Sequence, residues 1–138
     1  GGNNPIELMI VTTDIADILF RDCKAFGIDI VPFGKTLTGE LKDERITIHV
    51  KGQTPEKIWE KCFCEVNLCV PDLGMNIANT LRLKALERTA KKLFKSVTDE
   101  FDGTRYNYVV DTIHIEADTA LKCHFVNCRL LFNVLNVK

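Results

Sequence analysis

The sequence predicts an α+β fold in which two helices pack on a mainly antiparallel sheet of about five strands, in the order α-β-β-β-α-β-β. Two segments, 12–26 and 77–97, carry apolar residues at spacings of three and four, which is typical of amphipathic helices. Most of the remaining chain alternates between apolar and polar residues, which is typical of strands with one buried face. The last two strands follow each other without a helix between them, so we expect an antiparallel sheet.

The first helix is expected over 12–26. Asp14 lies in its first turn, where a negative charge interacts favourably with the helix dipole. Gly27 is expected to end the helix because glycine readily adopts a positive φ. The predicted buried face consists of Ile15, Ile18, Leu19, Cys23 and Phe26.

Three strand-like regions are expected next. A short apolar run over 28–31 precedes a hairpin, whose strands are predicted over 36–41 and 45–51. A longer strand is predicted over 58–70. One of its faces is formed by Cys62, Cys64, Val66, Leu68 and Val70. Trp59 and Phe63 make the other face partly apolar, so we expect that face to contact something there.

The second helix, over 77–97, combines an apolar stripe with a basic face. Its basic residues stand against a single acid, Glu87. The basic face has three possible roles: a solvated surface, an interface with an acidic partner subunit, or a phosphate-binding surface. The predicted apolar stripe is Ile77, Ala78, Leu81, Ala85, Leu86, Ala90, Leu93, Phe94 and Val97. The basic residues are Arg82, Lys84, Arg88, Lys91, Lys92 and Lys95.

An acidic turn is predicted over 98–103, followed by strands over 106–117 and 120–137. The apolar parity changes near Asp111, which predicts a bulge. Residues 6–138 are interpreted as one domain, and residues 1–5 as a tag scar or a disordered end. The side chains expected in the core include Leu19, Leu86, Val66, Leu68, Ile115 and Phe132.

Composition indicates a soluble folded domain. The chain has 138 residues, 46% of them hydrophobic and 27% charged, and a net charge of -1. That charge predicts no general attraction to nucleic acid or to an anionic membrane. No signal peptide is expected, and no apolar stretch reaches the roughly 18 residues that span a bilayer. The six cysteines lie in helix-like or strand-like patterns, so we expect free and mostly buried thiols.

No reactive constellation is expected, and the sequence therefore predicts no enzyme and no cofactor. His49, His114 and His124 fall in predicted strands, without a local nucleophile signature. Cys62 and Cys64 would lie about 7 Å apart on one strand, too wide for a zinc knuckle. The scattered glycines form neither a phosphate loop nor a dinucleotide fingerprint.

The order of the elements resembles that of the tail-terminator or tail-completion proteins of long-tailed bacteriophages. The likeness is one of topology and pattern over most of 8–137. It is carried by RITIHV at 45–50, FCEVNLCV at 63–70, LRLKALERTAKKLF at 81–94 and CRLLFNV at 128–134.

The resemblance implies a structural phage or prophage protein without an active site. Such proteins form rings, commonly hexamers, that cap the tail tube and join it to the head connector. The implied partners are therefore copies of the chain, the tail tube and head-connector proteins, with no membrane and no nucleic acid. The chain would reside in the cytoplasm during assembly and then in the virion. The candidate interaction surface is Arg82, Lys84, Arg88, Lys91, Lys92, Trp59 and Phe63.

Two other functions remain open at this point. A small-molecule-binding or enzymatic α+β domain would need an apolar pocket with converging polar groups. Its candidate lining residues are Trp59, Tyr106, Tyr108, His114 and His124. A nucleic-acid-binding module would use the basic face of the second helix, with affinity that falls as salt rises.

Overall fold

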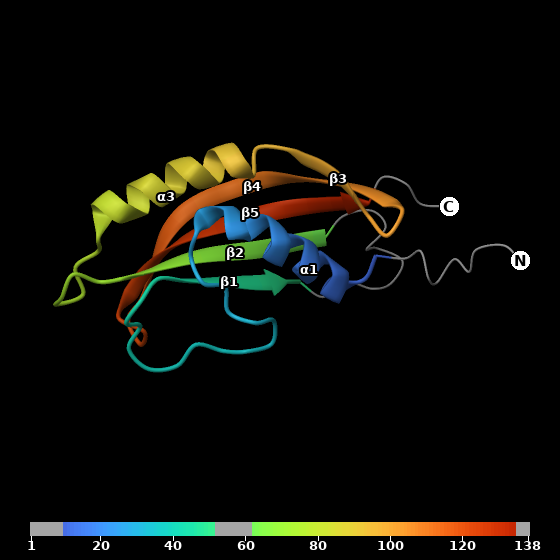
Figure 1. Ribbon diagram of the computed structural model, residues 1–138. Coiled ribbons are helices and arrows are strands. Elements are labelled where there is room, and N and C mark those ends of the chain that lie inside the picture. Colours follow the sequence, from blue (N-terminus) through green and yellow to red (C-terminus); the bar gives the residue numbers. More distant parts are fainter. Residues whose placement is uncertain (1–9, 52–61, 135–138) are drawn as a thin grey trace, which may run out of the picture.

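The computed structural model describes residues 10–51 and 62–134. Two α-helices cover one face of a five-stranded antiparallel sheet with the strand order β1-β2-β5-β4-β3 (Figure 1). The predicted α+β class is confirmed. The elements along the chain are α1 (Thr12–Cys23), η2 (Lys24–Phe26), β1 (Arg45–Val50), β2 (Cys62–Pro71), α3 (Thr80–Leu93), β3 (Val97–Phe101), β4 (Thr104–Asp118) and β5 (Cys123–Val134).

Helix α1 follows the prediction closely. The backbone N–H of Val11 donates a hydrogen bond of 2.9 Å to the Asp14 carboxylate, which fixes the start of the helix. The helix tightens into the 3-10 turn η2 and ends at Gly27, whose φ is 69°. Its buried face, centred on Ile15, Ile18 and Leu19, packs over β1 and β2 in the main core.

The expected strand over 36–41 is absent, which corrects the predicted hairpin. Ile30 instead makes a single parallel bridge to Ile46, and the chain then leaves the sheet edge as a loop. Leu37 and Leu41 pack from this loop onto the sheet face away from the helices, against Cys69 and Cys123. Their alternation is therefore that of a loop covering a small second core.

The acidic segment that was expected to be a turn contains strand β3. It pairs with β4 from Val97 opposite Tyr108 to Phe101 opposite Thr104. The actual turn is Asp102 and Gly103, both with positive φ, at 48° and 80°. An Asp-Gly pair with this conformation is a hairpin signal.

Strands β4 and β5 form the longest ladder, and the predicted bulge lies between Val110 and Thr112. The parity change in β5 has another cause, because its pairing with β2 runs without a shift. Cys123 and Phe125 belong to the small second core, whereas the residues from Val126 onward alternate into the main core. Side chains of this one strand therefore enter the cores on both faces of the sheet.

The predicted core is confirmed at Leu19, Leu86, Val66, Leu68 and Phe132. The prediction that Ile115 is buried is wrong, because 43% of this residue is exposed. Beyond the bulge, no other strand among the described residues pairs with the outer side of β4. Ile115 therefore lies at an open sheet edge, where less of the chain covers it.

Candidate functional site

The start of α3 is set by a projecting loop. The Asn79 side-chain oxygen accepts a hydrogen bond of 3.3 Å from the backbone N–H of Arg82, and the helix begins at Thr80. In the loop before it, the N–H of Leu73 donates to the carbonyl of Ile77 at 2.9 Å. The N–H of Ile77 donates back to the carbonyl of Gly74 at 2.9 Å, so the loop is closed by its own backbone.

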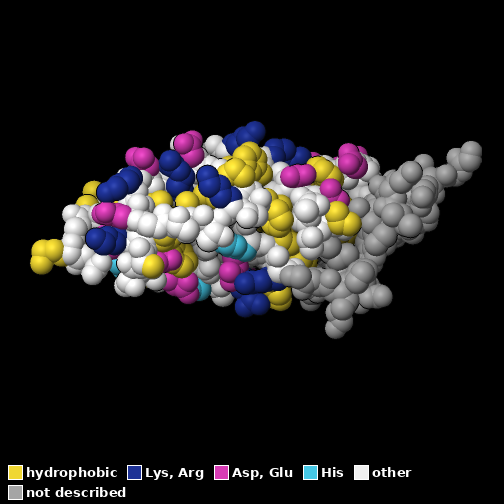
Figure 2. Space-filling model, turned by 90° about the horizontal axis from the view of Figure 1, so that it is seen from below, with side chains coloured by type: hydrophobic (Ala, Val, Ile, Leu, Met, Phe, Trp, Pro, Cys, Tyr) yellow, Lys and Arg dark blue, Asp and Glu magenta, His cyan; other side chains and the backbone are white. Residues whose placement is uncertain are grey.

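This loop and the first turn of α3 hold large apolar side chains in water. We call them the apolar tip: Leu73, Met75, Ile77 and Leu81, with exposed fractions of 69%, 93%, 56% and 81%. They project from the loop between β2 and α3, at the left of Figure 1, and a hydrophobic side chain stands out at the left end in Figure 2. Clustered exposed apolar side chains mark interaction sites in soluble proteins.

The apolar tip corrects the predicted stripe of this helix. Ile77 precedes the helix, and Leu81 and Ala85 are exposed on its outer side. The helix begins later than expected, and its buried face is centred on other residues. Those residues, continuing just past its end, are Leu83, Leu86, Ala90 and Phe94.

The predicted basic face divides into two groups. Arg82 donates two hydrogen bonds, of 2.7 and 2.9 Å, to the Glu44 carboxylate before β1. This contact raises the pKa of Arg82 and joins α3 to the start of β1. Lys91 pairs with Glu87 one turn away, at 3.7 Å. Both residues therefore have partners within the chain.

The other basic residues form a stripe along the outer side of α3. Lys84, Arg88 and Lys92 follow one another at a spacing of four, so they share one side of the helix. All three are exposed, and within residues 10–51 and 62–134 none forms a salt bridge. We call them the basic stripe. Leu81 of the apolar tip lies one turn before it.

Phe63, on the strand face that was expected to make a contact, contacts a residue of the same chain. The Arg129 guanidinium lies over its ring, 3.9 Å from the ring centre, in a cation–π contact. The Arg129 Nε also lies 3.8 Å from the Asp111 carboxylate at the bulge. Trp59, the other predicted member of this face, lies outside the described residues. Phe63 is therefore partly covered by its own sheet.

The residues suggested for a ligand pocket do not converge. The hydroxyl of Tyr108 donates to Asp22 at 2.7 Å, and Arg21 donates to the hydroxyl of Tyr106 at 2.6 Å. Burial, and next the bond to Asp22, raise the pKa of Tyr108. These two rings are thus core residues that connect α1 to β4.

The two histidines of that proposed pocket are also separate. His114 lies opposite Asn127, and its Nε2 is 2.8 Å from Glu116 on the same strand. His124 lies on the helix-covered face, where its Nδ1 is 2.7 Å from the Asp72 carboxylate. The two rings therefore occupy opposite faces of the sheet.

All six cysteines are buried, as predicted. Burial raises the pKa of the Cys128 thiol to about 12 and also raises that of Cys23, so neither is activated as a nucleophile. In the part of the chain that the structure describes, no three His, Cys, Asp or Glu residues lie close enough to hold a metal ion. No described helix is long and apolar enough to cross a membrane.

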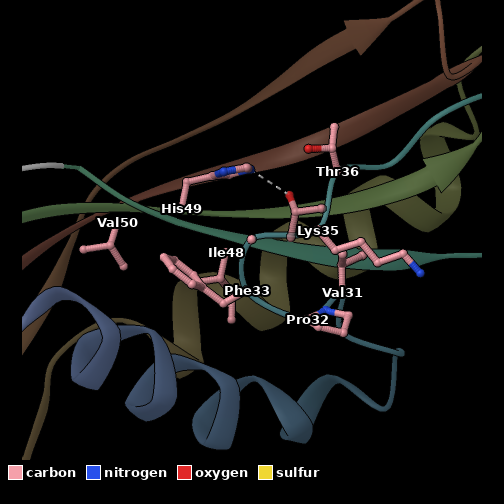
Figure 3. Close-up of a pocket in the computed structure, with 10 residues that line it drawn as sticks. Val31, Pro32, Phe33, Lys35, Thr36, Ile48, His49 and Val50 are labelled. Atoms are coloured by element: carbon pink, nitrogen blue, oxygen red, sulfur yellow. Dashed lines mark hydrogen bonds between the residues drawn. The ribbon is translucent and has the colours of Figure 1, made fainter.

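A shallow groove of about 240 Å³ runs beside the outer edge of β1 (Figure 3). One wall is the segment 31–36, with Phe33 largely exposed, and the other is the strand segment 47–50. The Nε2 of His49 lies 3.2 Å from the Thr47 hydroxyl there, on the face away from the helices. The groove is smaller than the pockets of about 300–1,000 Å³ that usually bind drug-sized ligands.

The geometry thus gives two exposed surfaces, the apolar tip and the basic stripe, both beside α3. The sequence indicated the stripe but missed the tip. The sequence did contain an indication of the tip. Four large apolar residues lie within a short segment at the start of the helix and in the loop before it, and one buried helix face cannot accommodate all of them. No protein-family model matches the chain, and no curated protein matches it.

Proposed function

We propose that this chain is a structural phage or prophage tail protein that forms a ring at the head-proximal end of the tail. The resemblance in sequence pattern at 45–50, 63–70, 81–94 and 128–134 supports this function. The observation that carries it is the apolar tip, because Leu73, Met75, Ile77 and Leu81 remain exposed in a folded domain. A loop closed by its own hydrogen bonds holds these side chains outward.

The apolar tip has the composition found at the centre of a protein interface. Apolar side chains lie at the centre of such surfaces, and charged groups surround them. The tip ends at Leu81, one turn before the basic stripe, so a partner is expected to offer an apolar pocket that takes the tip side chains. We assign this surface to a neighbouring protein of the tail, either the tail tube or the head connector.

Ring formation needs two further surfaces on each subunit. A closed ring is built head to tail, so one patch meets a different patch on the next copy. The sheet offers two edges for this purpose, at β1 and at the part of β4 that extends beyond its pairing with the outer strand β3. The proposal assigns no chemical reaction and no cofactor to the chain.

Tail tubes assembled from purified tube proteins of long-tailed phages provide the test. Wild-type protein is expected to form a ring in sedimentation velocity and to cap these tubes in electron micrographs. The double variant Met75→Asp, Leu81→Asp is expected to form the same ring but to leave the tubes uncapped. Val11→Asn, which changes an exposed apolar residue at the start of α1, is the matched control and should cap normally.

Two results would contradict the proposed function. One is a wild-type protein that stays monomeric at high concentration. The other is a wild-type ring that leaves tube ends bare. Saturable binding of a metabolite, with a shift in melting temperature, would instead favour a ligand-binding domain.

A further inference from the structure

We infer that neighbouring copies in this ring join their sheets, the open part of the β4 edge pairing with the open part of the β1 edge of the next copy. This inference rests on the proposed ring and goes further by naming the surfaces that meet. It commits to a second copy of this chain as the occupant of both edges.

The β1 edge is closed at one end and open at the other. The N–H of Ile46 donates to the carbonyl of Asp29, and the carbonyl of Ile46 accepts from Val31, so the backbone of Ile46 points away from β2. In an antiparallel ladder this direction recurs at every second residue. Ile48 and Val50 therefore also point outward, into the groove whose other wall is the segment 31–36, and within the described residues no strand pairs with them there.

The same alternation identifies the open groups of β4. Ile46, Leu68, Val126 and Ile115 lie opposite one another in one row across the four strands. Bonded and non-bonded pairs alternate along such a row, so the two ends point outward together. Ile115 thus presents its N–H and carbonyl to the outside.

The neighbouring row adds one more residue on β1 and one more on β4 whose backbone groups point outward. It runs from Ile48 through Val66 and Cys128 to Ile113. The next row reaches β4 at Val110. There the outward N–H already has a partner within the chain, because it donates to the carbonyl of Phe94 at 2.9 Å. Beyond that closure, the outer side of β4 has no strand partner among the described residues.

The two open segments match in length, direction and side-chain face. Each has two outward-pointing apolar residues, Ile48 and Val50 on β1, Ile113 and Ile115 on β4. All four side chains share the face covered by the helices, so pairing places apolar beside apolar. β1 and β4 also run in opposite directions within one sheet, so a second copy extends the sheet antiparallel with the same face covered.

The helices above these edges carry opposite charges. Helix α1 packs over β1 and helix α3 over β4 and β5, on the same face (Figure 1). Continuing the sheet brings α3 of one copy beside α1 of the next. The basic stripe of α3 then faces the outer side of α1, where Asp17 is exposed and has no ion pair among the described residues. Lys24, just past the end of this helix, lies over the exposed Phe20 ring, 5.6 Å from the ring centre, so the acidic contact is confined to the first half of α1.

The strand side chains on the opposite face follow the same charge pattern. β1 and its loop contribute Lys35, Arg45 and Lys51, of which Arg45 pairs with Asp29 at 4.0 Å and Lys51 with Glu65 at 3.4 Å. The open part of β4 contributes Asp111 and Glu116, which pair within the chain with Arg129 and His114. Because most of these charges already have partners in the chain, this face adds only a small preference for the heterologous contact over β1 with β1 or β4 with β4.

Proline substitutions test the edges without breaking the sheet. Ile115→Pro and Val50→Pro remove N–H groups that point outward, so the bonds to β5 and β2 remain. Ile115→Thr and Val50→Thr retain the N–H and serve as controls. In sedimentation velocity each proline variant alone is expected to be a monomer, and each threonine variant is expected to form the wild-type ring.

Mixing the two proline variants separates a head-to-tail contact from other modes. Each variant keeps one intact edge, so an equal mixture is expected to give a one-to-one dimer and nothing larger. Rings that persist in both folded proline variants, or a mixture that stays monomeric, would overturn the edge pairing. A wild-type ring would still support the proposed function in either case, whereas a wild-type monomer would overturn both.

If circular dichroism shows that a proline variant does not fold, exchanging the charges of Asp17 and Arg88 gives an independent measurement. Asp17→Lys and Arg88→Glu are each expected to weaken ring formation at least tenfold in the concentration at half assembly. The double variant, which restores opposite charges, is expected to recover most of that loss. Equal weakening in the single and double variants would contradict the contact between α1 and α3.

Discussion

The two halves of strand β4 have different surroundings although they belong to one continuous strand. From Tyr106 to Tyr108 the strand lies between β3 and β5, and Tyr106 and Tyr108 are fully buried. Beyond the bulge at Asp111, β5 is its only partner strand among the described residues, and most of its side chains are exposed. The difference teaches that one strand serves two purposes: its first half stabilises the fold, and its second half offers a surface.

The first half is stabilised by stacked aromatic rings. The ring centres of Tyr106 and Phe132 lie 5.0 Å apart, and those of Tyr108 and Phe132 lie 5.8 Å apart. Such pairs add about 0.5–1.5 kcal/mol beyond the burial of their area. Hydrogen bonds from Tyr108 to Asp22 and from Arg21 to Tyr106 connect the rings to α1.

The largest effect is expected from Tyr108→Ala. It removes a buried ring and one of the two hydrogen bonds to the Asp22 carboxylate, the other coming from Arg21, so the free energy of unfolding should fall by about 3–5 kcal/mol. Urea denaturation followed by circular dichroism measures this. Tyr108→Phe keeps the ring and should cost only about 1–3 kcal/mol. Equal losses in the two variants would show that the hydrogen bond, and not the packing, dominates.

A matched pair of truncations at the two ends of one row sharpens the comparison. Ile46→Ala removes a fully buried side chain and should cost about 2–5 kcal/mol, because Ile46 lies under α1. Ile115→Ala, in the open half of β4, should cost less than about 1 kcal/mol in the monomer. The same urea titration, run below the concentration of assembly, compares them. Similar costs would mean that the open half belongs to the core.

The smallest difference is expected between two arginines of α3. Arg82→Ala breaks the bidentate pair with Glu44 and should cost about 1 kcal/mol, since both side chains are partly exposed to solvent. Arg88→Ala should change stability by less than about 0.5 kcal/mol. Thermal unfolding ranks the two variants. A larger cost for Arg88 would place the basic stripe among the structural residues and weaken its role in association.

Periodicity was sufficient for the fold class, the helices and the bulge near Asp111, because each depends on which residues share a face. It failed where local patterns had another cause. Leu37 and Leu41 alternate like a strand, but they pack from a loop onto the opposite face. β3 is exposed and acidic, so it has no apolar alternation, and only its Asp-Gly turn indicated a hairpin.

The candidate surfaces were predictable only in part, because they depend on contacts distant in sequence. The pattern indicated a basic face on the second helix, but Glu44, the partner of Arg82, lies 38 positions away in sequence. The apolar tip was hidden because Leu81 and Leu83 are both plausible core residues. The start of α3 at Thr80 and its packing on β5 decide that Leu83 is buried and Leu81 is not.

The native mass of the wild-type protein tests the central claim most directly. Native mass spectrometry over a wide concentration range is expected to show a closed ring, at one fixed multiple of the 15.6 kDa chain, with no open series of larger species. A single species at 15.6 kDa at the highest concentration would contradict the claim that this chain works through the surfaces it offers to its own copies.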